Sequence, residues 1–171
     1  RDWSSDVCSS DLRSALLGEI DKGWSICEDT LRYERLCLSA ARIGAARRAF
    51  EFALDYAKTR IQFGKPIGSF QVIQHKFADM KIMLDTAQTM VRRYAWLMEN
   101  GQAERADTAV LKYYVGESFK SISDTCLQVL GGYGYCSEYP MQRFFRDSRL
   151  ATIGGGTSEI QKNIIAATLG L

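Results

Sequence analysis

The sequence predicts an all-α protein, folded as an antiparallel up-down four-helix bundle. Apolar residues recur every three or four positions over long stretches, which is the spacing of a helix face. Only two prolines, Pro66 and Pro140, interrupt the 171 residues. Short glycine-rich segments separate the periodic stretches, as expected of loops between helices. Hydrophobic residues make up 46% of the chain and charged residues 25%, which is typical of a globular domain with its own core.

The strongest periodicity lies in residues 69–100. The spacing between its apolar residues alternates between three and four over about four heptads, as in a packed helical seam. The seam residues are Phe70, Ile73, Phe77, Met80, Leu84, Ala87, Val91, Tyr94 and Met98. This pattern predicts one long helix that packs along its whole length.

Two further long helices are predicted on either side of this one. The first covers residues 28–59, and Gly64 and Pro66 end it and open a short loop. Its apolar stripe is Leu36, Ala40, Ile43, Phe50, Leu54 and Ala57. The second covers residues 102–130 and ends at a glycine-rich segment. Its stripe is Leu111, Val115, Phe119, Ile122, Cys126 and Val129.

The C-terminal part predicts two shorter helices. One lies around residues 140–149, and the last begins at Thr157 or Ser158, after three consecutive glycines. Ser158 and Gln161 have the spacing of a capping box, which predicts that Ser158 caps the last helix. We expect the three long helices and the terminal helix to form the bundle.

The N-terminal residues have a different character. Residues 1–12, RDWSSDVCSSDL, show no periodicity and resemble the translation of a sequencing adapter, whereas a disordered native linker is the alternative interpretation. We therefore exclude them from the predicted fold. Residues 13–24 are interpreted as the end of an earlier element with a linker, and residues 25–171 as the helical bundle.

The composition excludes several classes of function. Lysine and arginine number 22 against 20 acidic residues, so the net charge is +2, and this balance argues against a nucleic-acid partner. No window approaches the 18 apolar residues of a membrane span. Five cysteines and a single histidine, with no CxxC pair, argue against a zinc site and favour reduced thiols inside the cell.

Three segments have residue types suited to ligand binding. In residues 60–67, an arginine at a helix end suits phosphate oxygens, and an aromatic ring follows it. In residues 128–135, glycines allow a ligand to approach the backbone closely. In residues 154–159, bare amides stand at a helix N-terminus and attract anions. Each segment also has a purely structural interpretation: an interhelical loop, a helix C-cap with a turn, and a flexible helix start.

Taken together and in this order, the three segments resemble the C-terminal helical domain of the acyl-CoA dehydrogenase family. Tyr139-Pro140, Arg146-Asp147 and residues 156–161, GTSEIQ, belong to the same resemblance, which covers residues 17–171. It implies that residues 13–24 are a remnant of the family's middle β-barrel domain. It also implies an FAD-dependent enzyme that oxidises the Cα–Cβ bond of an acyl-CoA thioester.

The resemblance assigns the catalytic base to Glu34. In one branch of the family this glutamate directly precedes the Gly-Thr of the last motif, where the present sequence has Gly155. In the isovaleryl- and long-chain-type branch it lies on the first bundle helix before an arginine, which matches Glu34-Arg35. Glu34 shares a helix face with small apolar residues, and partial desolvation there would suit a base. The alternative is an exposed glutamate paired with Arg35 or Lys22.

The resemblance implies further roles. Arg35 and Gly156 would contact the acyl-CoA substrate. The residues assigned to FAD are Arg60, Phe63, Gln71, Gln128, Gly131, Gly132, Thr157 and Glu159. The first three of these would reach the FAD of a neighbouring subunit. The resemblance also implies a homotetramer. An electron-transfer flavoprotein is the expected electron acceptor. The expected compartment is the bacterial cytoplasm, or the mitochondrial matrix in a eukaryote.

Two alternative functions remain open from the sequence. An acyl-CoA oxidase-like enzyme shares much of the fold but passes its electrons to oxygen. A non-catalytic bundle that serves only oligomerisation is also compatible with the long seam. In the dehydrogenase interpretation, we expect the chain alone to be inactive, because other domains supply most of the flavin and acyl pocket.

Overall fold

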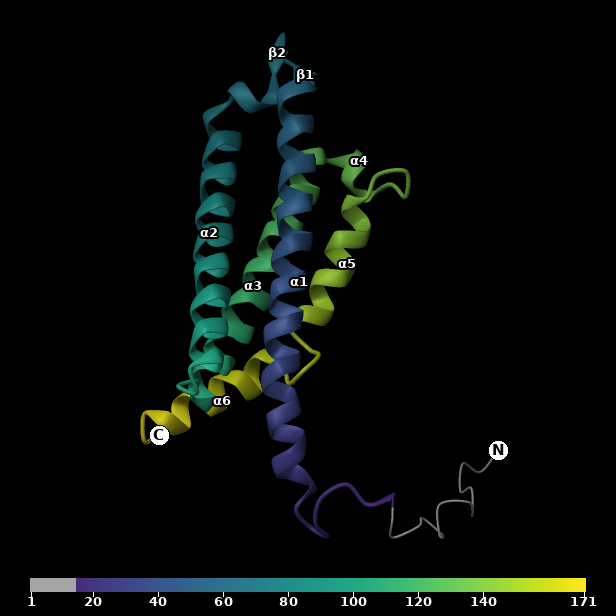
Figure 1. Cartoon of the computed structure of the whole chain (residues 1–171). Coiled ribbons are helices and arrows are strands. Elements are labelled where there is room, and N and C mark those ends of the chain that lie inside the picture. The colour runs from purple at the N-terminus through teal and green to yellow at the C-terminus, as the bar shows by residue number, and fades with distance from the viewer. Residues whose placement is uncertain (1–14) are drawn as a thin grey trace, which may run out of the picture.

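The computed structural model describes residues 15–171 and confirms the predicted all-α bundle (Figure 1). Three long helices run side by side in alternating directions: α1 (Gly23–Thr59), α2 (Gln71–Glu99) and α3 (Arg105–Leu130). All three lie where the periodicity predicts them. Helix α1 begins at residue 23, ahead of the predicted start at residue 28, so it extends into the segment interpreted as a linker.

The core is built from small residues on α1 and large residues on its neighbours. Ala49 and Ala53 of α1 are both 0% exposed, and their small side chains let α3 approach closely. Phe77 and Met80 of α2 and Phe119 of α3 fill the space around them. The predicted seam of α2 supplies its buried face, and every residue of the predicted α3 stripe is buried.

The connection between α1 and α2 is more ordered than the predicted loop. It contains an antiparallel hairpin of two short strands, β1 (Ile61–Gln62) and β2 (Lys65–Pro66), followed by the 3₁₀ helix η3 (Ile67–Ser69). The two residues between the strands, Phe63 and Gly64, have φ angles of +51° and +79°. Positive φ at both central positions is what a tight two-residue hairpin turn requires.

The C-terminal helices differ from the expected arrangement. After the short α4 (Gly132–Tyr135), α5 (Met141–Ala151) packs along α3 and α1, while α6 (Ser158–Thr168) crosses the lower end of the bundle against α3 (Figure 1). The fourth position of the bundle is therefore shared by α5 and α6, because three glycines separate them and redirect the chain. At Gly116 of α3, a Cβ would lie 2.8 Å from the Ala151 carbonyl oxygen, so glycine is what lets α5 end there.

The structure corrects one prediction, at the start of α6, and leaves two predictions about the N-terminal segment untested. The predicted cap of α6 is wrong by one residue: Thr157 is the N-cap and its hydroxyl accepts from the Ile160 amide at 3.3 Å, whereas the Ser158 hydroxyl bonds Glu117. The adapter-like interpretation of residues 1–12 falls outside the described residues. Residues 15–22 contain no strand, and their origin in a β-barrel stays a prediction. Among the described helices, none has the length and apolar character needed to cross a membrane.

Candidate active site

Residues 154–156, which we call the glycine turn, connect α5 to α6 in a conformation that requires glycine. Gly155 and Gly156 have φ angles of +69° and +92°, a region that residues with side chains rarely adopt. A Cβ on Gly156 would also lie 2.7 Å from Nε2 of Gln161. The backbone of this turn is thus fixed by both torsion and space.

Three buried side chains from three helices hold the carbonyl groups of the glycine turn. Nε of Arg35 on α1 donates to the Gly155 oxygen at 3.0 Å, and Nζ of Lys112 on α3 donates to the Gly156 oxygen. Nε2 of Gln161 on α6 donates to the Gly156 oxygen at 3.0 Å and lies 3.4 Å from the Gly155 oxygen. Both carbonyl groups are therefore engaged inside the bundle.

The amide groups of the glycine turn remain available to a ligand. Within residues 15–171, the amides of Gly155 and Gly156 have no hydrogen-bond acceptor, and both residues are partly exposed. They stand next to the N-terminus of α6, where the helix dipole adds positive potential. Such amides bind anions and the oxygens of polarised carbonyl groups.

Glu34, the predicted base, lies on α1 directly before Arg35. Its side chain is exposed, and neither alternative partner engages it, because Lys22 pairs with Glu19 at 2.6 Å and Arg35 bonds the glycine turn. Leu38, one turn along the same face, is half-buried. The desolvation expected around Glu34 is therefore not supplied by the residues that the structure describes.

Thr157 and Glu159, two predicted cofactor contacts, follow the glycine turn at the start of α6. Glu159 is exposed; hydrogen bonds from its own backbone amide and from the Thr157 hydroxyl lower the pKa of its carboxyl group. A carboxyl group with a lowered pKa is a weaker base. Glu159 is therefore poorly suited to accept a proton. Glu34, Arg35 and Gly156 lie at the same end of the bundle as Thr157 and Glu159.

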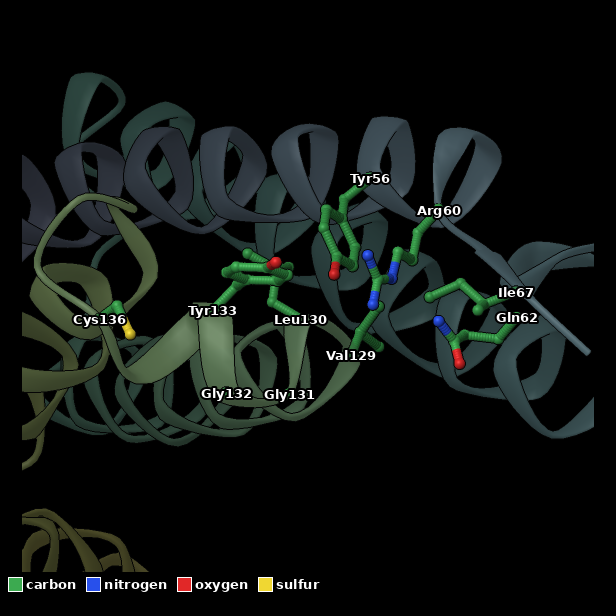
Figure 2. Close-up of a pocket in the computed structure, with 10 residues that line it drawn as sticks. All are labelled: Tyr56, Arg60, Gln62, Ile67, Val129, Leu130, Gly131, Gly132, Tyr133 and Cys136. Carbon is green, nitrogen blue, oxygen red and sulfur yellow. The ribbon is translucent and has the colours of Figure 1, made fainter.

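A second group of predicted residues surrounds a pocket at the opposite end of the bundle (Figure 2). The pocket has a volume of about 460 Å³. It opens between the end of α1, the hairpin and the glycine-rich segment after α3. Its lining residues are Tyr56, Arg60, Gln62, Ile67, Val129, Leu130, Gly131, Gly132, Tyr133 and Cys136.

Arg60 is oriented by the end of α1 and by an aromatic ring. Its amide donates to the Tyr56 carbonyl oxygen at 2.8 Å, and its guanidinium carbon lies 5.5 Å from the centre of the Tyr133 ring. The two tyrosine rings meet edge to face, with centroids 6.4 Å apart. Burial raises the pKa of Tyr56, and Arg60 opposes that shift. An arginine fork, aromatic rings and exposed glycine backbone together suit a nucleotide with phosphate groups.

The other predicted FAD contacts lie at this end of the bundle but outside the pocket lining. Gln128 is exposed on the last turn of α3, and Gln71 is the exposed first residue of α2. Phe63, at the hairpin tip, is 91% exposed. Gly131 has φ +61° and forms the C-cap of α3, so the structural interpretation of this segment is confirmed locally. Its contact with FAD stays a prediction.

Sequence reasoning missed four residues that shape these sites. Tyr56 and Tyr133 line the pocket, and Lys112 and Gln161 hold the glycine turn. A pattern in the sequence does point to Lys112. It stands seven residues before Phe119, on the buried face of α3, where a lysine is unusual.

Comparison with known proteins identifies the family. The model of the family described as "Acyl-CoA dehydrogenase, C-terminal domain" matches residues 21–170. Benzylmalonyl-CoA dehydrogenase of Aromatoleum aromaticum is 46% identical over 137 residues, which cover 80% of this chain and 36% of that protein. The caffeyl-CoA reductase-Etf complex subunit CarC of Acetobacterium woodii is 38% identical over 169 residues, which cover 97% of this chain and 45% of that protein.

Solved structures agree with this result. The chain matches butyryl-CoA dehydrogenase from Megasphaera elsdenii with a TM-score of 0.87 and 35% identity, over 91% of this chain and 40% of that one. The helical bundle described above is thus the fold of the C-terminal domain of acyl-CoA dehydrogenases. The chain belongs to the acyl-CoA dehydrogenase family. It spans less than half the length of the curated relatives that it matches here.

Proposed function

We propose that this chain is the catalytic helical domain of a flavin-dependent acyl-CoA dehydrogenase that introduces a Cα–Cβ double bond into an acyl-CoA thioester. The observation that carries the proposal is the connection between the candidate base and the glycine turn. Glu34 directly precedes Arg35, and Arg35 holds the Gly155 carbonyl at 3.0 Å. Arg35 thus ties the helix that carries Glu34 to the glycine turn, whose Gly155 and Gly156 amides have no acceptor among residues 15–171.

The residues of this chain have distinct tasks in that reaction. Glu34 accepts the α proton of the thioester, while the Gly155 and Gly156 amides bind the thioester oxygen and favour the negative charge that develops there. Arg35 also contributes to substrate binding in this proposal. Leu38 supplies part of an apolar surface beside Glu34, and cover by further residues of the enzyme would raise its basicity.

The two ends of the bundle fit FAD in different ways. The pocket near the hairpin offers Arg60 for phosphate oxygens, with Gly131 and Gly132 open to close approach, and Gln128, Phe63 and Gln71 surround it. Thr157 and Glu159 present polar groups beside the glycine turn. When bound, FAD supplies a ring system that accepts a hydride equivalent from the β carbon.

The decisive experiment uses the flavin-loaded enzyme that contains this chain, mixed without oxygen with a panel of acyl-CoA thioesters. Rapid loss of the oxidised flavin absorbance is expected with at least one thioester. Glu34→Gln keeps the shape of the side chain but removes the base, so bleaching slows by about 10²- to 10⁴-fold. Glu51→Gln, an exposed glutamate on the same helix, is the matched control and keeps the wild-type rate.

The outcomes separate the alternatives. Equal bleaching rates in the wild type and Glu34→Gln would show that the base lies elsewhere. No bleaching with any thioester would contradict the dehydrogenase function and favour a non-catalytic oligomerisation bundle. Rapid reoxidation of the reduced flavin by oxygen would favour an acyl-CoA oxidase. The isolated 171-residue chain is expected to show no turnover.

The proposed partners are an electron-transfer flavoprotein and further copies of the same chain. The relationship to a subunit of a reductase-Etf complex supports the first partner. The second is supported by Phe63, which is 91% exposed at the tip of the hairpin. We expect a homotetramer, and sedimentation of the whole enzyme tests it. The four described cysteines are free thiols, which suits the reducing bacterial cytoplasm or mitochondrial matrix that we propose.

A further inference from the structure

Three cationic side chains are buried in the part of the bundle that holds the glycine turn, and two of them, Arg35 and Lys112, bond the turn. Arg35 is 7% exposed, Arg42 is 9% exposed and Lys112 is 1% exposed. Within the described part of the chain, none of the three forms an ion pair. Burying a charge without an ion-pair partner costs free energy. Hydrogen bonds from these side chains therefore have to offset that cost.

Lys112 makes one hydrogen bond in the described structure, and its acceptor is the Gly156 carbonyl oxygen. The same oxygen accepts from Gln161, so both of its lone pairs are used. The Gly156 carbonyl and the Thr157 amide belong to one peptide group. The two hydrogen bonds to the carbonyl fix the plane of that peptide group, and with it the orientation of the turn that precedes it.

The groups around Lys112 keep its charge poorly compensated. Burial, together with the nearby charges of Arg42 and Arg35, lowers the pKa of Lys112 to about 8. Glu117 on α3 and Glu159 on α6 act in the opposite direction. The Lys112 ammonium is therefore protonated below pH about 8 and loses its proton above that value.

Glu117 is already engaged by two other side chains. One of its carboxylate oxygens accepts from the Ser158 hydroxyl at 2.7 Å, and the other lies 3.5 Å from Nζ of Lys120. It therefore stabilises the start of α6 rather than pairing with Lys112. The backbone of the glycine turn is thus the direct partner of the buried ammonium.

We propose that Lys112 is a positioning residue, which holds the Gly156 carbonyl inside the bundle and thereby presents the amides of the glycine turn to the substrate. This role rests on the proposed function. Lys112 contacts neither substrate nor flavin in this proposal, and its effect passes through the backbone alone. The rigid turn then meets the thioester oxygen without reorganisation, which is the condition for strong stabilisation of developing charge.

The first test observes the hydrogen bond directly in the full 171-residue chain. With ¹³C at the glycine carbonyl carbons, the Gly156 resonance is expected to move with a midpoint near pH 8. Lys112→Met removes this movement, and Lys112→Arg keeps a charged donor but abolishes the midpoint. Lys81→Met, an exposed lysine paired with Asp85 on α2, leaves the titration unchanged. A wild-type Gly156 resonance with no midpoint between pH 7 and pH 10 overturns the inference, and this result needs no variant.

The second test measures the consequence in the flavin-loaded enzyme. Lys112→Met is expected to lower kcat by about 10- to 100-fold while FAD content and KM change little, and Lys112→Arg restores most of the loss. Unchanged kcat in Lys112→Met, in an enzyme that bleaches with acyl-CoA, overturns the inference and leaves the proposed function standing. If none of the thioesters bleaches the flavin of the wild-type enzyme while the Gly156 titration persists, the proposed function is overturned and the positioning of the turn is supported.

Discussion

At Gly156, torsion and space act together to exclude a side chain. Its φ angle is +92°, and a Cβ would meet Nε2 of Gln161 at 2.7 Å and a terminal nitrogen of Arg35 at 3.4 Å. Both neighbours also donate to the turn, so neither can move away without losing a hydrogen bond. The orientation of the amides proposed to bind the thioester oxygen therefore depends on having glycine at position 156.

Gly156→Ala is expected to lower the free energy of unfolding by about 2 kcal/mol, because it combines an unfavourable φ with a short contact. Urea unfolding followed by circular dichroism measures the change. Gly44→Ala on α1 is the matched control, since a Cβ there meets nothing within 4 Å. The control is expected to gain about 0.5–1 kcal/mol from helix propensity. Equal unfolding midpoints for the two variants would contradict the proposed constraint.

At the scale of the element, α2 shows how far local periodicity determines packing. Its apolar seam was predicted from spacing alone, and the buried face of the helix follows that seam. Met80 is 1% exposed, and its sulfur lies 3.5 Å from the Cys126 sulfur on α3. Ile82, two residues on, points away from the seam and is 63% exposed.

Met80→Ala is expected to cost about 2–5 kcal/mol, because it removes buried methylene groups and leaves a cavity between α2 and α3. Ile82→Ala, an apolar truncation on the exposed face of the same helix, is expected to change stability by less than about 0.5 kcal/mol. Thermal and urea unfolding of both variants tests the difference. A larger loss for Ile82→Ala would mean that another surface covers this face of α2.

At the scale of the whole molecule, the two groups of site residues lie at opposite ends of the bundle (Figure 1). Glu34 and Arg60 both belong to α1 and its cap, and a helix rising about 1.5 Å per residue separates them by about 39 Å. This separation suits an active site that combines the glycine turn of one subunit with Arg60 of another, as the resemblance implies.

Mixed assembly tests this arrangement. Glu34→Gln and Arg60→Ala enzymes are each expected to have low activity, the second through loss of FAD. Co-expressed subunits would regain about one quarter of the wild-type activity, because half of randomly formed pairs are mixed and one of the two sites in each is intact. Sites built within one subunit would show no recovery, and each variant purified and mixed without co-assembly is the control.

The sequence by itself determined the long helices, the buried stripes of α2 and α3, and the family, and it named Arg60, Gly131 and Gly132, which the structure brings to one pocket. The predicted stripe of α1 is partly wrong: Ala40 is exposed, whereas Ala46, Ala49 and Ala53, which lie outside the predicted stripe, are buried. Helix periodicity and capping are local properties, so the spacing of apolar residues and the positions of glycines predict them. The order of short motifs added the resemblance that the comparisons confirmed.

Only the tertiary structure decided how the glycine turn is held. Arg35 and Lys112 bond carbonyl groups 120 and 44 positions away in the sequence, and no local pattern encodes such contacts. The same holds for the exposure of Glu34 and for the direction of α6, which depend on how α1, α3 and α5 pack. Local spacing fixes which residues are helical, whereas long-range packing fixes which of them meet, and the chemistry depends on the second.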